Sequence, residues 1–231
     1  MIELDKIYNE DCLEGMNRIP DGRVDLIVTD PPYLIHSECG GGILKKRDYL
    51  DNITDKKLNV GIDERFLEQM VRIMKKVNIY IFCSKNQLGM YFNFFQKYNC
   101  DILVWHKLNP IPMCNNKYLS DLEYIFFVRE NGVPIFGTFA DKSKLYQSVV
   151  NKEDLNKYGH PTIKPLQLVR RFVCNSSEEG ATICDPFMGS GTTAVACIRE
   201  KRHFIGFELN KEYFDKACKR IDAERRQLTL F

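Results

Sequence analysis

The sequence lacks the features that mark membrane and secreted proteins. It has no apolar run of about 18 residues, the length that a membrane-spanning helix needs. Its N-terminus is acidic, with no basic segment leading into an apolar one, so no signal peptide is indicated. We therefore expect a soluble, unprocessed, cytoplasmic protein with no membrane partner.

The cysteine pattern argues against a disulfide-rich or zinc-binding protein, and the net charge gives no sign of a polyanionic partner. The nine cysteines contain no C-x-x-C pair and no nearby cluster with histidine, so neither a disulfide framework nor a zinc site is indicated, and no metal is expected. The net charge is only +2, which does not by itself predict a polyanionic partner. Basic groups such as Lys45–Arg47 and Arg170-Arg171 are, taken alone, better explained by a solvated surface.

Apolar runs of strand length alternate with amphipathic helix patterns along most of the chain. We expect strands at 25–29, 77–83, 101–106, 123–128, 181–184 and 203–207, and helices at 63–76, 86–98, 166–173, 192–201 and 211–225. No internal repeat is present. The alternation predicts a single α/β domain over residues 1–231, doubly wound around a mostly parallel sheet.

Two segments interrupt this alternation. Residues 36–61 contain three consecutive glycines and many charges, which predicts a mobile loop. Residues 110–160 contain one expected strand in otherwise irregular polar and aromatic sequence, which predicts a small insertion. Loops of this length usually have a function of their own.

A glycine-rich turn at residues 185–193 connects an expected strand to an expected helix, and Glu208 ends the next strand. Such a turn lets a ligand approach the backbone, and such an acidic residue accepts from ribose hydroxyls, so a nucleoside cofactor is predicted. The G-x-G-x-x-G and Walker patterns are both absent. Asp185 would repel a phosphate but attract a cation, which favours S-adenosylmethionine over NAD. A turn that only packs helix on strand is the structural alternative.

A second motif, Asp30-Pro31-Pro32-Tyr33, directly follows the expected strand 25–29. Together with the turn at 185–193, it resembles the DNA amino-methyltransferases, which methylate exocyclic nitrogens of adenine or cytosine. The match extends to Asn9–Cys12, Trp105–Pro110 and His160–Pro165. The motif order resembles the beta arrangement of that family, in which the catalytic half precedes the cofactor half.

The resemblance implies a Rossmann-like methyltransferase fold that uses S-adenosylmethionine to methylate a base flipped out of double-stranded DNA. An aromatic amino nitrogen is a poor nucleophile because its lone pair is delocalised into the ring. The Asp30 carboxylate and the Pro31 carbonyl can accept its hydrogens and direct that lone pair at the methyl group, and the carboxylate stabilises the developing positive charge. The prolines stiffen the chain, and Tyr33 offers a face for base stacking.

The resemblance also implies a set of site residues. The catalytic residues are Asp30, Pro31, Pro32 and Tyr33. The cofactor-binding residues are Asp11, Cys12, Asp30, Thr162, Lys164, Asp185, Pro186, Phe187, Gly189, Ser190, Gly191, Thr192 and Glu208. Asp11 would accept from the adenine of the cofactor, although a cap or turn residue is the alternative there. Glu208 would hold the ribose, and Thr162 with Lys164 would reach the carboxylate, although Lys164 could also be plain surface.

The target base and the wider function leave alternatives. In this family an aspartate at the first motif position more often accompanies adenine, so N6-adenine is favoured over N4-cytosine. Rival classes are a nicotinamide-dependent oxidoreductase, opposed by the missing third glycine, a methyltransferase acting on protein or RNA, and a non-catalytic DNA-binding relative. His106 and His160 are interpreted as structural, because this transfer needs no histidine.

The two interrupting segments are the candidates for contact with DNA. The segment 110–160 includes Asn115-Asn116-Lys117-Tyr118, Lys142, Lys144 and Lys152, whose asparagines and lysines can read base edges and whose lysines can contact phosphate. The loop 36–61 would close over the duplex. Because 110–160 is small for a recognition region, we expect a short target or help from a second subunit, so a homodimer is possible. Restriction–modification is the expected setting.

Overall fold

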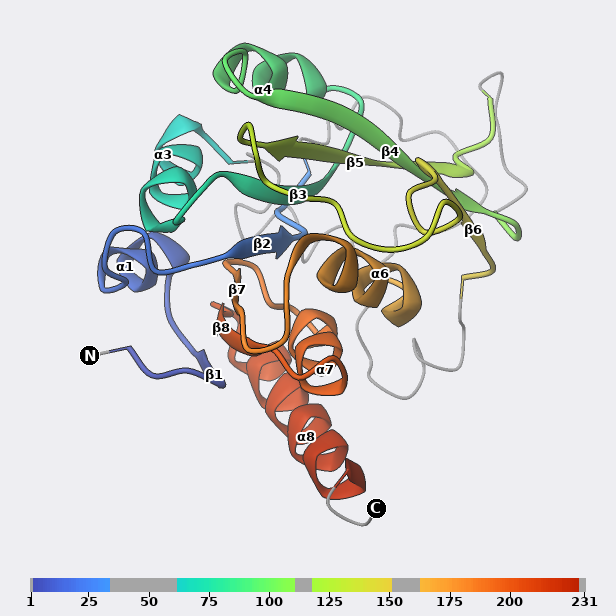
Figure 1. Ribbon diagram of the computed structural model, residues 1–231. Helices are drawn as coiled ribbons and strands as arrows, with labels where there is room; N and C mark the ends of the chain where they lie inside the picture. The colour runs from blue at the N-terminus through green and yellow to red at the C-terminus, as the bar shows by residue number, and fades with distance from the viewer. Residues whose placement is uncertain (1, 34–61, 111–117, 151–162, 229–231) are drawn as a thin grey trace, which may run out of the picture.

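One eight-stranded sheet organises the chain in the computed structural model, which describes residues 2–33, 62–110, 118–150 and 163–228 (Figure 1). The strands are β1 (Lys6–Tyr8), β2 (Leu26–Thr29), β3 (Asn78–Cys83), β4 (Asn99–Lys107), β5 (Leu122–Arg129), β6 (Leu145–Ser148), β7 (Thr182–Asp185) and β8 (His203–Phe207). The helices are α1 (Cys12–Asn17), α3 (Glu64–Ile73), α4 (Leu88–Phe94), α6 (Leu166–Ser176), α7 (Thr192–Arg199) and α8 (Lys211–Leu228).

The sheet has the order β1-β8-β7-β2-β3-β5-β4-β6, and of these strands β5 alone runs against its neighbours. Helices α1, α3 and α4 cover one face, and α6, α7 and α8 cover the other (Figure 1). The predicted α/β class with a mostly parallel, doubly wound sheet is therefore confirmed. None of the helices in these ranges is long and apolar enough to cross a membrane.

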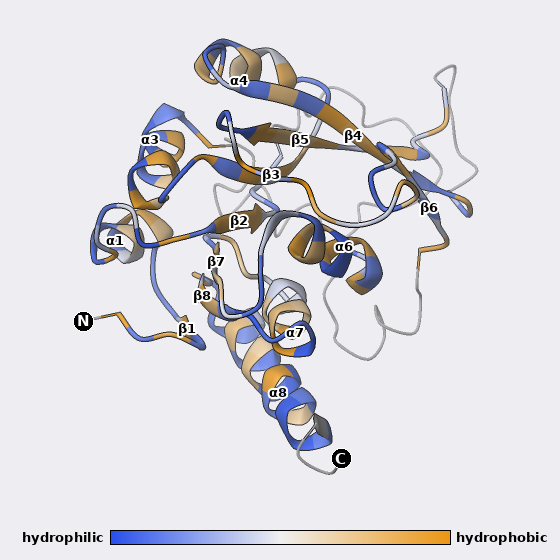
Figure 2. Cartoon of the chain, viewed as in Figure 1, coloured by the Kyte–Doolittle hydropathy of each residue, from blue (hydrophilic) through white to orange (hydrophobic). Residues whose placement is uncertain are grey.

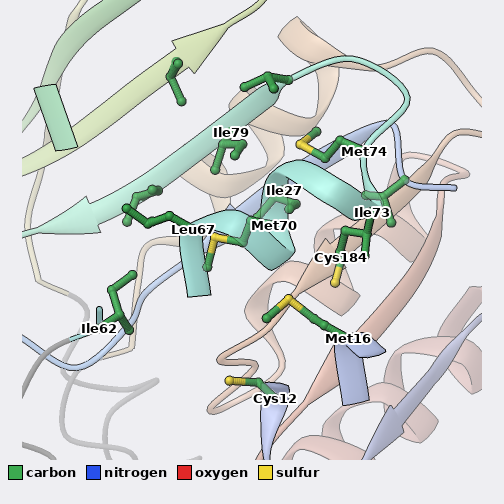
Figure 3. Close-up of a cluster of buried hydrophobic side chains, with 14 of the residues drawn as sticks. Cys12, Met16, Ile27, Ile62, Leu67, Met70, Ile73, Met74, Ile79 and Cys184 are labelled. Atoms are coloured by element: carbon green, nitrogen blue, oxygen red, sulfur yellow. The ribbon is translucent and has the colours of Figure 1, made fainter. Parts of the chain in front are cut away.

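Both faces of the sheet are apolar because helices cover each of them. On one face Ile27 and Ile79 pack with Met16 of α1 and Met70 of α3, as Figure 3 shows. On the other face Leu26, Val28 and Tyr80 pack against α6, and β2 is drawn mainly in hydrophobic colours in Figure 2. Neighbouring residues of one strand thus serve two separate cores, which explains the unbroken apolar runs in the sequence.

Three short elements were not predicted. Strand β1 and helix α1 have three and six residues, which is shorter than the windows over which periodicity can be recognised. The expectation of one strand within 110–160 is wrong, because residues 118–150 contain both β5 and β6. Strand β6 is an edge strand of four residues that alternate between exposed and half-buried, so it carries no apolar run. The loop 36–61 lies outside the described residues.

The sheet has a topological switch point between β2 and β7. From β2 the chain continues through α3 to β3 on one side, and from β7 it continues through α7 to β8 on the other. Such a divergence leaves a crevice at the carboxyl ends of the two strands, which is where open α/β sheets bind their ligands. The Thr29 hydroxyl, at the end of β2, donates to Asp185 Oδ1, at the end of β7, over 2.9 Å.

Candidate active site

The predicted acidic residues gather at the carboxyl edge of the sheet. Asp30 follows β2, Asp185 ends β7 and Glu208 follows β8, and these three strands are neighbours. Because parallel strands all end at the same edge, the two halves of the predicted site meet although they lie far apart in the sequence. The structure therefore brings the two predicted motifs to one edge of the sheet.

Asp30 has one oxygen that the protein holds and one that it leaves free. Its Oδ2 lies 2.7 Å from the Lys164 ammonium. Its Oδ1 is buried and has no hydrogen-bond partner among the described residues, although the side chain as a whole keeps 24% exposure. Burial raises the pKa of Asp30 above its ordinary value, with the Lys164 charge acting against burial and the Glu123 carboxylate acting with it.

A second buried carboxylate, Glu123 of β5, completes a chain of ion pairs behind Asp30. Its Oε1 lies 2.7 Å from the Lys164 ammonium, and its Oε2 lies 2.6 Å from Lys107 at the end of β4. Burial alone would raise the pKa of Glu123, but Lys164 and Lys107 together outweigh it and hold the pKa at about 2. Burial lowers the pKa of Lys164, but Asp30 and Glu123 raise it above its ordinary value, so both partners are charged.

Tyr33 is fixed by the same group. Its hydroxyl donates to Glu123 Oε1 over 2.7 Å, and the Lys164 ammonium lies 5.3 Å from the centre of its ring. Burial is the main cause that raises the pKa of Tyr33, so the hydroxyl stays protonated. The ring is therefore held in one orientation beside Asp30, as a stacking platform requires.

The backbone at Pro32 is bonded by the segment between β3 and α4. Pro31 is buried, and the Pro32 carbonyl accepts from Gln87 Nε2 over 3.4 Å. Gln87 is itself buried, and its Oε1 accepts from the backbone N–H and hydroxyl of Ser84. Sequence reasoning missed both Gln87 and Glu123. No local signal marks Glu123 in the sequence, because it is the first residue of the expected strand 123–128, a position at which an acidic side chain is usually solvated.

The glycine-rich turn has the local geometry that the motif predicted. Gly189 and Gly191 have φ values of 51° and 79°, in the left-handed region that glycine adopts at no steric cost. A Cβ on Gly191 would lie 3.3 Å from the Cβ of Ala217, so α8 packs directly behind the turn. Arg220 of α8, which is buried, donates to the Ser190 carbonyl.

Asp185 serves the fold in addition to any ligand. Its oxygens accept from Thr29 Oγ1, from the Phe187 backbone N–H at 3.0 Å and from Thr193 Oγ1 at 2.6 Å. Burial raises the pKa of this carboxyl to about 7, against the effect of these three donors. Pro186 is buried beside it. The predicted position along the methionine part of the cofactor stays a prediction.

Glu208 and Asp11 are both held by backbone N–H groups. Glu208 Oε2 accepts from Gly189 over 2.9 Å, and its Oε1 accepts from Asn210 over 2.7 Å. Burial raises the pKa of Glu208. Asp11 is the N-cap of α1 and accepts from the Leu13 N–H over 2.8 Å, so the structural interpretation of this residue is realised, while its predicted contact with the cofactor stays a prediction.

Most of the remaining predicted positions lie in the described part of the chain, and one lies outside it. Cys12 is buried at the start of α1, and burial raises the pKa of its thiol to about 12. The Phe187 ring lies 5.8 Å from that of Phe66, between the turn and α3. Thr192 and Ser190 are buried at the start of α7, with 3.3 Å between their hydroxyls. Thr162 lies outside the described residues.

Within the described ranges, neither His106 nor a group of metal-ligating side chains forms a second candidate site. His106 Nδ1 lies 2.9 Å from Gln147 Nε2, and its Nε2 lies 3.5 Å from Asp121, so both ring nitrogens have protein neighbours. His160 lies outside the described residues. In the described part of the chain no three His, Cys, Asp or Glu side chains are grouped to hold a metal ion.

Known proteins resemble this chain in sequence and in structure. A family model named N6_N4_Mtase and described as DNA methylase matches residues 24–219. The type II methyltransferase M.HpaI of Haemophilus parainfluenzae is 27% identical over 253 residues, which cover 95% of this chain and 74% of that protein. The M1.HpyAVI–SAM complex is 26% identical with a TM-score of 0.71, covering 93% of this chain and 98% of that one.

A third similarity concerns the fold alone. The PvuII DNA methyltransferase, described as cytosine-N4-specific, has a TM-score of 0.70 at 17% identity, over 96% of this chain and 91% of that one. The family match extends over well more than half of the chain and contains Asp30, Asp185 and Glu208. The chain therefore belongs to the N6_N4_Mtase family of DNA methylases.

Proposed function

We propose that the chain transfers a methyl group from S-adenosylmethionine to the exocyclic N6 amino group of adenine in double-stranded DNA, after the base has flipped out of the duplex. The observation that carries the proposal is that the two carboxylate oxygens of Asp30 have different surroundings. Lys164 holds Oδ2, while the buried Oδ1 has no partner in the part of the chain that the structure describes. A buried acceptor without a donor costs free energy, so an amino N–H of the substrate is its complement.

This arrangement suits an amino nitrogen as the nucleophile. Oδ1 of Asp30 accepts one amino hydrogen, and the Pro31 carbonyl accepts the other, so the nitrogen lone pair turns out of the plane of the base. Positive charge then develops on that nitrogen as the new N–C bond forms, and the fixed carboxylate stabilises it where water is excluded. Asp30 therefore first orients the amino group and stabilises the positive charge on its nitrogen. It accepts a proton from that nitrogen afterwards.

Tyr33 holds the flipped base. Stacking on an aromatic ring stabilises a base by about 1–3 kcal/mol, which is comparable with the few kcal/mol that extrusion from the duplex requires. Because the Tyr33 hydroxyl is bonded to Glu123, the ring does not have to be ordered when the base arrives. The preformed platform therefore offsets part of the cost of flipping.

The cofactor half offers acceptors that fit S-adenosylmethionine, the cofactor that is named in the M1.HpyAVI complex. Each Glu208 oxygen accepts one backbone N–H, which leaves a lone pair on each for a ribose hydroxyl. Carboxylates at the ends of β7 and β8 disfavour a phosphate and favour a cationic ligand. When bound, S-adenosylmethionine supplies an electrophilic methyl group on its sulfonium. Asp11, Phe187 and the glycine-rich turn line the same edge.

Adenine is favoured by the aspartate at the first position of the motif, which in this family accompanies adenine more often than cytosine. The N4 amino group of cytosine also lies beside a ring nitrogen, so N4-cytosine is the alternative product. We assign sequence recognition to residues 110–160 and further DNA contact to residues 36–61, of which 36–61, 111–117 and 151–160 lie outside the described residues. M.HpaI is named as a type II methyltransferase, which supports a restriction–modification setting.

Methyl transfer to unmethylated genomic DNA tests the proposal. Wild type and Asp30→Asn are incubated with labelled S-adenosylmethionine, and the methylated nucleosides are identified by mass spectrometry. We expect N6-methyladenine from wild type and at least about 100-fold less from Asp30→Asn, since a preorganised electrostatic contact to developing charge is lost. N4-methylcytosine would overturn the base assignment, and an active Asp30→Asn variant would overturn the role of the carboxylate.

Asp25→Asn is the matched control. Asp25 lies just before β2, at the opposite edge of the sheet, where its carboxylate accepts from the Thr182 N–H and pairs with Lys75. The same isosteric change is made there without touching the crevice. This variant should methylate DNA like the wild type, so a loss shared by both variants would point to a general effect of removing a carboxylate.

A further inference from the structure

The Lys164 ammonium is shared equally between two carboxylates. It lies 2.7 Å from Asp30 Oδ2 and 2.7 Å from Glu123 Oε1, and both Lys164 and Glu123 are 8% exposed. In a site that is buried to this extent, charges interact more strongly than they do in water. The position of one ammonium between two competing carboxylates therefore decides how much negative charge each of them presents.

Glu123 has anchors on both of its oxygens, so it is a rigid competitor for Lys164. Oε1 also accepts from the Tyr33 hydroxyl, and Oε2 pairs with Lys107 over 2.6 Å. The register of β5 between β3 and β4 sets the position of Glu123, which lies opposite Trp105. Glu123 therefore cannot follow Lys164 if the ammonium moves toward Asp30.

We propose that Glu123 is a positioning residue for methyl transfer, which draws the Lys164 ammonium partly away from Asp30 and so keeps the negative charge of Asp30 available to the target amino group. The inference rests on the proposed role of Asp30. Without Glu123, Lys164 would pair with Asp30 alone and neutralise it more completely. The amino nitrogen would then find a weaker acceptor, and its developing positive charge would be less stabilised.

The groups that surround Asp30 make this competition testable by pH. Within the described ranges, the other titratable side chains in electrostatic reach of Asp30 are Tyr33, Cys83, Tyr91 and Asp185. Burial keeps the first three of these protonated, because it raises the pKa of each of them. Asp185 can add only negative charge. Of the cations that the structure describes, Lys164 is thus the one whose position sets the titration of Asp30, and Glu123 controls that position.

The first test is Glu123→Gln, with single-turnover methylation followed from pH 5 to 9 at saturating DNA and cofactor. We expect the plateau rate to fall by about 10- to 100-fold, as is typical when a group that orients a reacting residue is lost. We also expect the acid limb to move to lower pH, because the negative charge that raises the pKa of Asp30 has been removed. A plateau loss with an unmoved acid limb, or no loss, would overturn the proposal.

Lys107→Gln gives the opposite test and does not depend on the folding of the first variant. It leaves Glu123 charged but less neutralised, so Glu123 holds Lys164 more tightly and the acid limb should move to higher pH. A purely structural role of the ion pairs predicts a lower plateau rate for both variants, whereas the proposal predicts no loss of plateau rate for Lys107→Gln, because Asp30 keeps its negative charge available. A shift in the same direction for both, or no shift for Lys107→Gln, would overturn the proposal.

Two further variants separate this inference from its alternatives. Tyr33→Phe removes the hydrogen bond to Glu123 and a hydroxyl that lowers the pKa of Asp30, so the acid limb should move to higher pH, and a shift to lower pH equal to that of Glu123→Gln would overturn the proposal. Glu200→Gln makes the same change in the half-buried pair with Arg170, away from the crevice, and should behave like wild type. If Asp30→Asn remains active, the proposed role of Asp30 fails, independently of the result for Glu123.

Discussion

Asp185→Ala should destabilise the folded chain even when no cofactor is present. The carboxylate accepts from Thr29 of β2, from the Phe187 backbone N–H in the glycine-rich turn and from Thr193 of α7. Asp185 is only 4% exposed, so water cannot replace it as the acceptor. Alanine would leave three donors without their partner at the switch point between β2 and β7.

The size of the loss follows from the number of donors. A buried donor left without an acceptor costs about 1–3 kcal/mol, so three set an upper sum of roughly 9 kcal/mol. The two threonine hydroxyls can rotate toward other acceptors, whereas the Phe187 N–H is fixed, so we expect a loss of roughly 3–5 kcal/mol. This is a large part of the about 5–15 kcal/mol by which domains are usually stable.

Asp185→Asn separates the effect of the carboxyl charge on stability from the effect of its hydrogen bonds. Burial raises the pKa of Asp185 to about 7 in the folded chain, whereas an unfolded aspartate titrates near pH 4. The folded state therefore keeps a proton that the unfolded state releases. The free energy of unfolding that this carboxyl contributes is fully present below about pH 4 and is lost as the pH rises to about 7. The decline amounts to about 4 kcal/mol, at about 1.4 kcal/mol per pKa unit, and the amide variant should not show it.

Urea unfolding of the cofactor-free protein provides the assay. The single tryptophan, Trp105, is 3% exposed, so its fluorescence reports loss of the core. Curves at pH 5 and pH 7.5 are compared for wild type, both Asp185 variants and Asp25→Asn, a control in which the amide oxygen still accepts the Thr182 N–H. An Asp185→Ala variant that unfolds like wild type but binds S-adenosylmethionine poorly would refute the reasoning, because the carboxylate would then serve the cofactor alone.

Three further predictions concern stacking, packing and DNA affinity. Tyr33→Ala should raise the KM for DNA by roughly 5- to 150-fold, the equivalent of about 1–3 kcal/mol of stacking, while Tyr33→Phe keeps it near wild type. Gly15→Ala should lower the Tm despite its better helix propensity of about 1 kcal/mol, because the new Cβ would lie 2.2 Å from the buried Phe207 ring and such overpacking costs about 1–3 kcal/mol. Replacing Lys45–Arg47 by neutral residues should reduce the salt slope of DNA binding by up to about 3; an unchanged slope would exclude this loop from the phosphates.

The motifs could be recognised from the sequence because each is contiguous and follows an apolar strand. Asp30 and Asp185 both come directly after runs with the composition of buried strands, and parallel strands end at one edge of their sheet. Their proximity therefore followed from the fold class alone. The turn at 185–193 likewise showed its left-handed positions through its glycines.

The support behind the catalytic motif was not visible in the same way. Glu123 is a single acidic residue at the start of a strand, and nothing local distinguishes it from a solvated one. Gln87 is equally inconspicuous in the sequence, although it is buried against Pro32. Lys164 was expected to reach the cofactor, whereas the structure pairs it with two carboxylates.

The sequence by itself determined the fold class, the family and the residues at the strand ends, because these depend on local patterns that need no knowledge of pairing. Only the tertiary structure decided that Asp30, Glu123 and Lys164 form one group. That meeting depends on β5 running in reverse between β3 and β4, which brings its first residues to the edge where the parallel strands end. Strand order and direction arise from contacts between distant segments, and no local periodicity encodes them.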